Sequence, residues 1–94
     1  MERLSDAEIE QHLQGVSGWE LLDGTAIARE LELPDFAAAV AFVVAVADAA
    51  EEQGHHPDIL IHGYNHVRLT LSTHSQGGLT EADFKLAGRL DQLA

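Results

Sequence analysis

The chain has 94 residues, 46% of them apolar, with sixteen acidic and five basic residues and no cysteine, so its formal net charge is −11. This length suits a single domain over residues 1–94, and the absence of cysteine excludes disulfides and thiolate chemistry. The scarcity of basic residues argues against direct nucleic-acid binding. No apolar run is long enough to span a bilayer, and the N-terminus has no signal-peptide pattern. We therefore expect a cytoplasmic protein.

An amphipathic helix is predicted near the N-terminus. Ser5 and Glu8 have the spacing of a capping box, in which each side chain hydrogen-bonds the backbone amide of the other residue. Apolar residues then recur at helical spacing as far as Val16. The pattern predicts a helix from about Asp6 to Gln14, and we expect His12 to be a surface residue of it.

Two strands joined by a tight turn follow this helix. The turn is Asp23-Gly24, a pair that suits the positive φ angles of a type I′ hairpin. The strands are predicted at Trp19–Leu22 and Thr25–Leu33, the second because its apolar residues alternate. Arg29 interrupts the apolar face of the second strand, so we expect it near a sheet edge.

The longest apolar segment predicts a largely buried helix from Phe36 to about Gln53. Asp35 can cap its start, and Gly54 suits a left-handed residue after its end. The first three turns are apolar almost all round, which is more than a helix needs for packing on one sheet. We therefore expect one face of this helix to contact partner subunits.

A second hairpin and a last helix complete the pattern. Strands are predicted at Ile59–Ile61 and His66–Thr73, the second with regular alternation of apolar and polar residues. Thr80 and Asp83 form another capping pattern, in which we expect Asp83 to be only a helix cap. The element order α-β-β-α-β-β-α predicts an α+β two-layer sandwich, with a four-stranded antiparallel sheet and three helices on one face.

Three histidines and one acid are the candidate site residues. Glu51 lies one helical turn before His55, where its carboxylate either orients the imidazole or is a solvated charge at a helix end. His55 and His56 precede Pro57, which favours extended backbone, so their side chains should point to opposite sides. His74 shares the parity of the polar face of its strand. Because imidazoles titrate near neutral pH, this group indicates proton transfer on a small molecule.

Two other functions are open from the residues alone. Six histidines and sixteen acids could form a His-rich metal-binding module, for zinc or a similar ion, although no pair has the spacing of a familiar site. The apolar helix could instead belong to a non-catalytic oligomeric interaction protein on the same fold. Stoichiometric metal would favour the first function, and tight association without catalysis would favour the second.

Four motifs occur in order along the chain, namely Glu51-x-x-x-His55-His56-Pro57, Tyr64-Asn65-x-Val67, Leu71-Ser72-Thr73-His74 and Gly78-Leu79-Thr80-x-x-Asp83. Together they resemble the pterin-4a-carbinolamine dehydratase family, most strongly from about Phe36 to Leu90. The resemblance implies the antiparallel fold described above and no metal or organic cofactor. It also implies a homodimer or homotetramer that forms through the Phe36–Ala50 helix.

The resemblance further implies a reaction, the dehydration of 4a-hydroxytetrahydropterin to quinonoid dihydropterin in tetrahydropterin recycling. His55, His56 and His74 match the family's active-site histidines, and Glu51 matches its acidic residue. We expect His56 and His74 to exchange protons with the substrate, while His55, oriented by Glu51, binds the pterin and shares the role of base. The expected substrate-binding residues are Ser72, Thr73, Pro57 and Ile59.

Two features depart from the family pattern. Many members have an aromatic residue where this chain has Ile59, so one stacking surface is missing. The segment between His56 and His74 is one residue longer than in animal members. Some animal members also act as dimerisation cofactors for a homeodomain transcription factor, and no residue here supports that role.

Overall fold

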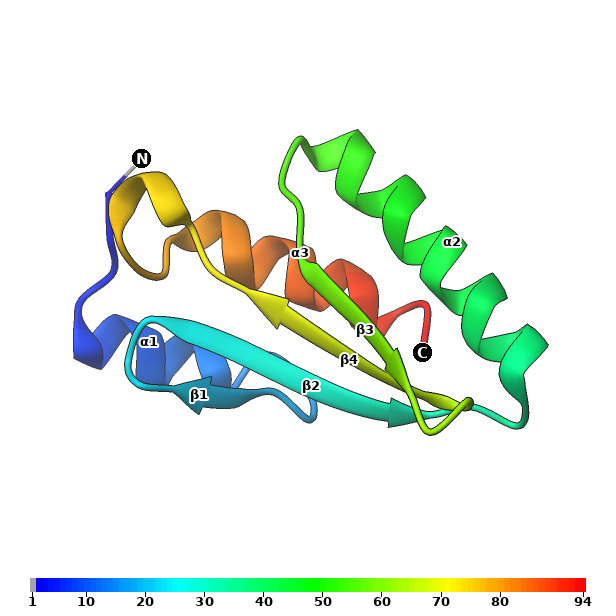
Figure 1. Ribbon diagram of the computed structural model, residues 1–94. Coiled ribbons are helices and arrows are strands. Elements are labelled where there is room, and N and C mark those ends of the chain that lie inside the picture. Colours follow the sequence, from blue (N-terminus) through cyan, green and yellow to red (C-terminus); the bar gives the residue numbers. More distant parts are fainter. Residues whose placement is uncertain (1) are drawn as a thin grey trace.

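The fold is a four-stranded sheet with three helices, in the predicted order (Figure 1). The computed structural model describes residues 2–94. The helices are α1 (Asp6–Leu13), α2 (Phe36–Gln53) and α3 (Glu81–Asp91), and the strands are β1 (Glu20–Leu22), β2 (Ala26–Glu32), β3 (Asp58–His62) and β4 (His66–Leu71). Every strand pairs antiparallel with its neighbours in the order β1-β2-β4-β3. The predicted α+β class and antiparallel sheet are confirmed.

The two faces of the sheet differ in chemistry. One face is covered by the helices, and Figure 1 shows α1 and α3 behind the strands, with α2 alongside β3. Alternate residues of β4 are buried there, while His66, Arg68 and Thr70 point to the open face. On that open face Thr70 lies between Ala28 of β2 and Asp58 of β3. The buried side chains of the core include Ile27, Phe42, Val46, Val67, Leu69, Leu71, Leu79, Phe84, Leu86 and Leu90.

Local capping signals fix the helices on either side of the candidate site. Asp35 Oδ1 accepts a hydrogen bond from the Ala38 amide at 2.8 Å, which starts α2. Gly54 follows α2 with φ +63°, a left-handed conformation that reverses the direction of the chain. Thr80 and Asp83 form the capping box that starts α3. The helix ends predicted from these residues are therefore confirmed.

Asp91, at the C-terminal end of α3, anchors this helix to the sheet. Its carboxylate accepts hydrogen bonds from the Ser17 amide at 2.9 Å, from Trp19 Nε1 at 2.8 Å and from Arg29 Nη1 at 2.5 Å. The sequence predicts Arg29 near a sheet edge, but β2 is an inner strand. Because β1 pairs only with residues 26–28 of β2, Arg29 lies just beyond the end of β1. Its charge therefore reaches the partly buried Asp91 instead of solvent.

No helix within residues 2–94 combines the length and the apolar character that crossing a membrane requires.

Candidate active site

The three candidate histidines meet at one end of the sheet. His55 and His56 follow α2 and precede β3, whereas His74 begins the turn after β4. The start of β3 lies beside the end of β4, because the two strands are antiparallel neighbours. All three histidines line one cavity of about 240 Å³, together with Gly54, Ser72, Thr73 and Ser75. The fold thus brings imidazoles from distant segments to one place.

A buried carboxylate holds His55. His55 Nε2 lies 2.6 Å from Asp83 Oδ1. The His55 side chain is 16% exposed, and the Asp83 side chain is 0% exposed. The other Asp83 oxygen accepts hydrogen bonds from Thr73 Oγ1 at 2.7 Å and from the Thr80 amide at 2.9 Å. Both carboxylate oxygens are therefore used, as a buried charge requires. The expectation that Asp83 is only a helix cap is wrong, since the same side chain also orients His55.

Glu51 contacts His56 and not His55. Glu51 Oε2 hydrogen-bonds His56 Nε2, and both side chains are exposed. The expected pairing of Glu51 with His55 is wrong, because the left-handed Gly54 turns the chain after the last turn of α2. His55 then faces α3, while His56 stays near the helix end. The prediction that the two neighbouring imidazoles point to different sides agrees with these partners.

A short closed loop places His74. β4 ends at Leu71, not at Thr73 as predicted, and His74–Gln76 forms a single 3₁₀ turn. Thr73 and Gly78 close this loop through two backbone hydrogen bonds, of 2.9 and 3.4 Å. Gly77 completes the turn with φ +68°. His74 is therefore an exposed side chain on a fixed turn beside the end of the sheet.

A second cavity adjoins the first on the open face of the sheet. Its volume is about 390 Å³, and it shares His56, Ser72 and His74 with the three-histidine cavity. Ser72 Oγ donates a hydrogen bond to the Thr25 carbonyl at 2.8 Å. The remaining lining residues of this second cavity are Thr25, Ala26, Asp58, Thr70 and Gly77.

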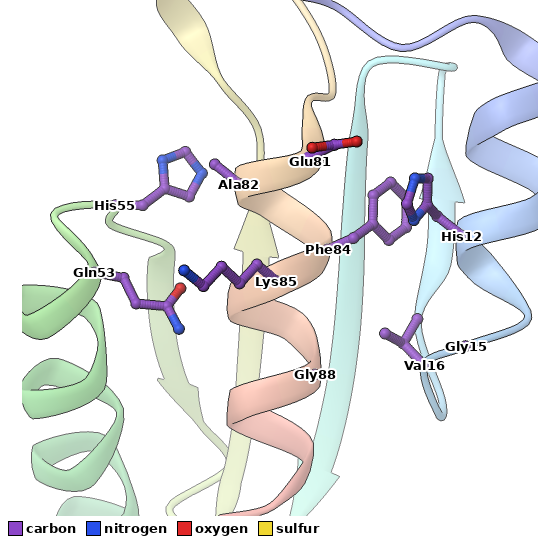
Figure 2. Close-up of a pocket in the computed structure, with 10 residues that line it drawn as sticks. All are labelled: His12, Gly15, Val16, Gln53, His55, Glu81, Ala82, Phe84, Lys85 and Gly88. Atoms are coloured by element: carbon purple, nitrogen blue, oxygen red, sulfur yellow. The ribbon is translucent and has the colours of Figure 1, made fainter. Parts of the chain in front are cut away.

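A larger groove of about 540 Å³ lies on the helix side of His55 (Figure 2). α3 forms its floor, and Figure 2 shows His12 of α1 on one side and Gln53 at the end of α2 on the other. The His12 ring stacks on Phe84 with centroids 5.1 Å apart, so His12 is not the simple surface residue that the sequence predicts. This groove is the largest cavity described, but it includes neither His56 nor His74. The three-histidine cavity brings together three side chains that are able to transfer protons and is therefore the better candidate for chemistry.

The other expected substrate-binding residues divide into two groups. Ser72 and Thr73 line the three-histidine cavity. Pro57 and Ile59 line neither this cavity nor the adjoining one, and Ile59 packs against the core on the helix side of the sheet. Sequence reasoning missed Asp58 as a cavity residue. The alternation along the second hairpin could have found it, because Asp58 shares the open face with Thr70.

The histidines and acids of the described chain do not form a metal site. Within residues 2–94, no three histidine or acidic side chains are grouped closely enough to bind an ion. On the open face, the His62 and His66 rings stack with centroids 5.3 Å apart. Glu30 contacts His62, and Glu32 lies 3.6 Å from His66, so each imidazole is paired with a separate carboxylate.

Comparisons with known proteins agree with this geometry. A family model described as pterin 4 alpha carbinolamine dehydratase matches residues 2–93. A protein of Chloroflexus aggregans, provisionally named pterin-4-alpha-carbinolamine dehydratase, is 52% identical over 93 residues, which cover 99% of this chain and 98% of the relative. A relative in Thermomicrobium roseum with the same provisional name is 50% identical over 94 residues, which cover 100% of this chain and 99% of the relative.

Two solved structures share the fold. The structure of a transcriptional coactivator/pterin dehydratase from Brucella melitensis has a TM-score of 0.92 and 38% identity, with 99% of each chain covered. A pterin dehydratase-like protein, described as a RuBisCO assembly factor in the alpha-carboxysome, has a TM-score of 0.69 and 30% identity, with 82% of this chain and 89% of that chain covered. With the family model matching almost from end to end, the chain belongs to the pterin-4α-carbinolamine dehydratase family.

Proposed function

We propose that the protein dehydrates 4a-hydroxytetrahydropterins to quinonoid dihydropterins by histidine acid–base catalysis. The observation that carries the proposal is the cavity shared by His55, His56 and His74. Three imidazoles around one cavity can supply a proton to one atom of a bound ring and remove a proton from another. Membership of the family supports the choice of a pterin as the ring.

The proposed steps need only proton transfers. The lone pair of pterin N5 expels the hydroxyl group from C4a, and an imidazolium protonates that oxygen so that it leaves as water. A neutral imidazole then accepts the proton from N5, which yields the quinonoid product. We assign these two transfers to His56 and His74, which are the more exposed rings of the cavity. Each transfer is typically worth about 10²–10⁴-fold in rate.

We assign His55 to binding and orienting the pterin. Because the Asp83 carboxylate can only accept a hydrogen bond, His55 Nε2 carries a proton, and Nδ1 is the nitrogen left to exchange one. Glu51 would orient His56, because its carboxylate pairs with His56 Nε2. Since both side chains are exposed, this ion pair should contribute no more than about 1 kcal/mol.

The direct test is stopped-flow absorbance that follows the loss of synthetic 4a-hydroxytetrahydropterin. His56→Ala and His74→Ala should each lower kcat at least about a hundredfold. His62→Ala is the matched control, because His62 lies at the far end of β3 and lines neither histidine cavity. Near-normal turnover in both active-site variants would refute the assignment.

We also propose that the protein forms a homodimer or homotetramer through α2. Three large apolar side chains, spaced four residues apart on this helix, are exposed in the single chain: Phe36 (56%), Val40 (40%) and Val44 (56%). A stripe of this kind supports contact with another protein surface. It equally supports the alternative of a non-catalytic interaction protein, which predicts association without faster dehydration. Size-exclusion chromatography with light scattering tests the oligomer, and a strict monomer at micromolar concentration would refute it.

A further inference from the structure

We propose that Arg3 is a positioning residue for His74, because its side chain covers the base of the loop that carries this histidine. The inference rests on the proposed dehydration, in which His74 exchanges a proton with the substrate. Arg3 lines neither of the two histidine cavities, so it acts on the site only through the loop. It is therefore a residue outside the site that affects proton transfer within it.

The segment before α1 lies beside this loop. The Leu4 amide donates a hydrogen bond to the Leu79 carbonyl at 2.8 Å, and the Leu4 side chain is buried in the core. Figure 1 shows the segment before α1 passing next to the turn that follows β4. Residues 3 and 4 are therefore held against residues 78 and 79, although these pairs come from opposite ends of the sequence.

The Arg3 side chain lies directly over Gly78. A Cβ atom added to Gly78 would lie 2.7 Å from Arg3 Nε and 3.2 Å from both Cδ and Cζ. Because glycine has no side chain, the arginine can approach the loop backbone this closely. Gly78 is buried, whereas Arg3 is exposed, so the arginine separates this part of the loop from solvent.

Gly78 closes the loop that carries His74. Thr73 and Gly78 share two backbone hydrogen bonds, and His74 is the first residue after this bridge. Thr73 Oγ1 also holds the base of the loop to α3, since it donates to Asp83 at 2.7 Å. Backbone hydrogen bonds that are shielded from water open less often than exposed ones. Removing Arg3 should therefore let the base of the loop open more often and widen the range of positions that His74 occupies.

Charge keeps the Arg3 guanidinium near the loop. Arg3 lines a cavity of about 300 Å³ together with Glu2, Glu8 and Glu81. A guanidinium is always protonated, so these carboxylates attract it. Within residues 2–94 none of the close ion pairs includes Arg3, so no single carboxylate draws it away from Gly78.

Proton transfer depends steeply on the position of the imidazole. A proton donor or acceptor must lie within hydrogen-bond distance of the atom that it serves. A displacement of about 1 Å can cost about 10²-fold in rate, even when its cause is far from the reacting atoms. Because Arg3 does not contact the substrate, its loss should lower kcat and leave KM nearly unchanged.

The experiment measures the loop and the reaction in wild type and Arg3→Ala. Hydrogen exchange followed by NMR should be about fivefold to tenfold faster at the Thr73 and Gly78 amides of the variant. Stopped-flow dehydration should show kcat lowered by about the same factor, with KM within about twofold of wild type. Because Arg3 is exposed, Tm should fall by no more than about 4 °C. Arg68→Ala is the matched control, because it removes another arginine outside both histidine cavities and should change neither exchange nor kcat.

Gly78→Ala tests the same contact from the side of the loop. Its added Cβ must displace the Arg3 side chain, so it should speed exchange at Thr73 and lower kcat to a similar extent. The double variant should be no more impaired than either single variant, because all three lack one and the same contact. Additive effects would mean that the two residues act separately, and they would overturn the inference.

Hydrogen exchange separates this inference from the proposed reaction. Unchanged exchange at Thr73 and Gly78 in Arg3→Ala overturns the inference, even if the wild type is a fast dehydratase. Faster exchange with unchanged kcat also overturns it, because the loop would then open without consequence for His74. If the wild type does not catalyse dehydration, the proposed reaction fails, while faster exchange in Arg3→Ala still supports the role of Arg3 in holding the loop.

Discussion

Replacing Asp83 with asparagine should separate the orientation of His55 from its packing. The asparagine side chain would have almost the same shape, and its carbonyl oxygen could still accept from Thr73 and from the Thr80 amide. Its NH₂ group, however, would face His55 Nε2, which now donates to Asp83 Oδ1. Because two N–H donors cannot hydrogen-bond each other, the His55 imidazole must either move its proton to Nδ1 or lose the contact with residue 83.

The expected magnitudes follow from these contacts. Loss of one charge-assisted hydrogen bond at a buried site should destabilise the fold by about 1–3 kcal/mol. In a domain of this size each kcal/mol lowers Tm by roughly 4–8 °C. Asp83→Ala, which leaves His55 without any partner, should cost more, about 3–5 kcal/mol. We expect Asp83→Asn to lower kcat by at least about tenfold, because the wrong nitrogen of His55 would carry the proton.

Stopped-flow dehydration measures kcat, and ¹⁵N NMR of labelled histidine reports which ring nitrogen is protonated. The control is Asp91→Asn, at the opposite end of α3, since that carboxylate also accepts three hydrogen bonds but lies far from the cavity. Asp91→Asn should lower Tm and leave kcat unchanged. An Asp83→Asn protein with wild-type kcat and an unchanged tautomer of His55 would show that the reasoning is wrong.

Three further predictions concern stability and association. Hydrogen bonds with the backbone and side chain of Ser5 lower the pKa of Glu8 below its ordinary value of 4.5, so the folded state favours the ionised carboxylate. The ionised carboxylate therefore stabilises the fold above pH 4.5. This contribution is lost as the pH falls through the lowered pKa. The Tm difference between wild type and Glu8→Gln should therefore narrow in thermal melts below pH 4.5, and a difference independent of pH would contradict this. Gly88→Ala should stabilise α3 by about 0.5–1 kcal/mol, because an added Cβ meets nothing within 4 Å, and a lower Tm in thermal melts would show that the backbone there needs glycine. Val44→Glu should convert the expected oligomer to monomer in light scattering, and an unchanged mass would exclude this part of α2 from the interface.

The elements that sequence predicted well depend on local chemistry. Asp35 and Gly54 specify the two ends of α2 because a cap acts on amides and carbonyls within one turn. The alternation along β4 separated buried from open residues for the same reason, since side chains of a strand alternate regardless of what covers them. The three histidines could be chosen as candidates because they follow the predicted ends of α2 and β4.

The partners of those histidines could not be read from spacing. Glu51 and His55 are one helical turn apart only if the helix continues, and the left-handed Gly54 ends it first. Asp83 is 28 residues from His55 in sequence, so their contact depends on how α3 packs beside the end of α2. The stacking of His12 on Phe84 likewise joins α1 to α3. Contacts of this range are set by tertiary packing, which a single sequence does not show.

The double role of Asp83 couples the orientation of His55 to the opening of a helix. Its carboxylate caps the first turn of α3 and holds His55, so fraying of that turn would release the imidazole in the same event. A ligand that binds the oriented imidazole must then oppose this local unfolding by mass action. Amide hydrogen exchange at Thr80 and in the first turn of α3 should slow when a pterin occupies the cavity, although none of those residues lines it.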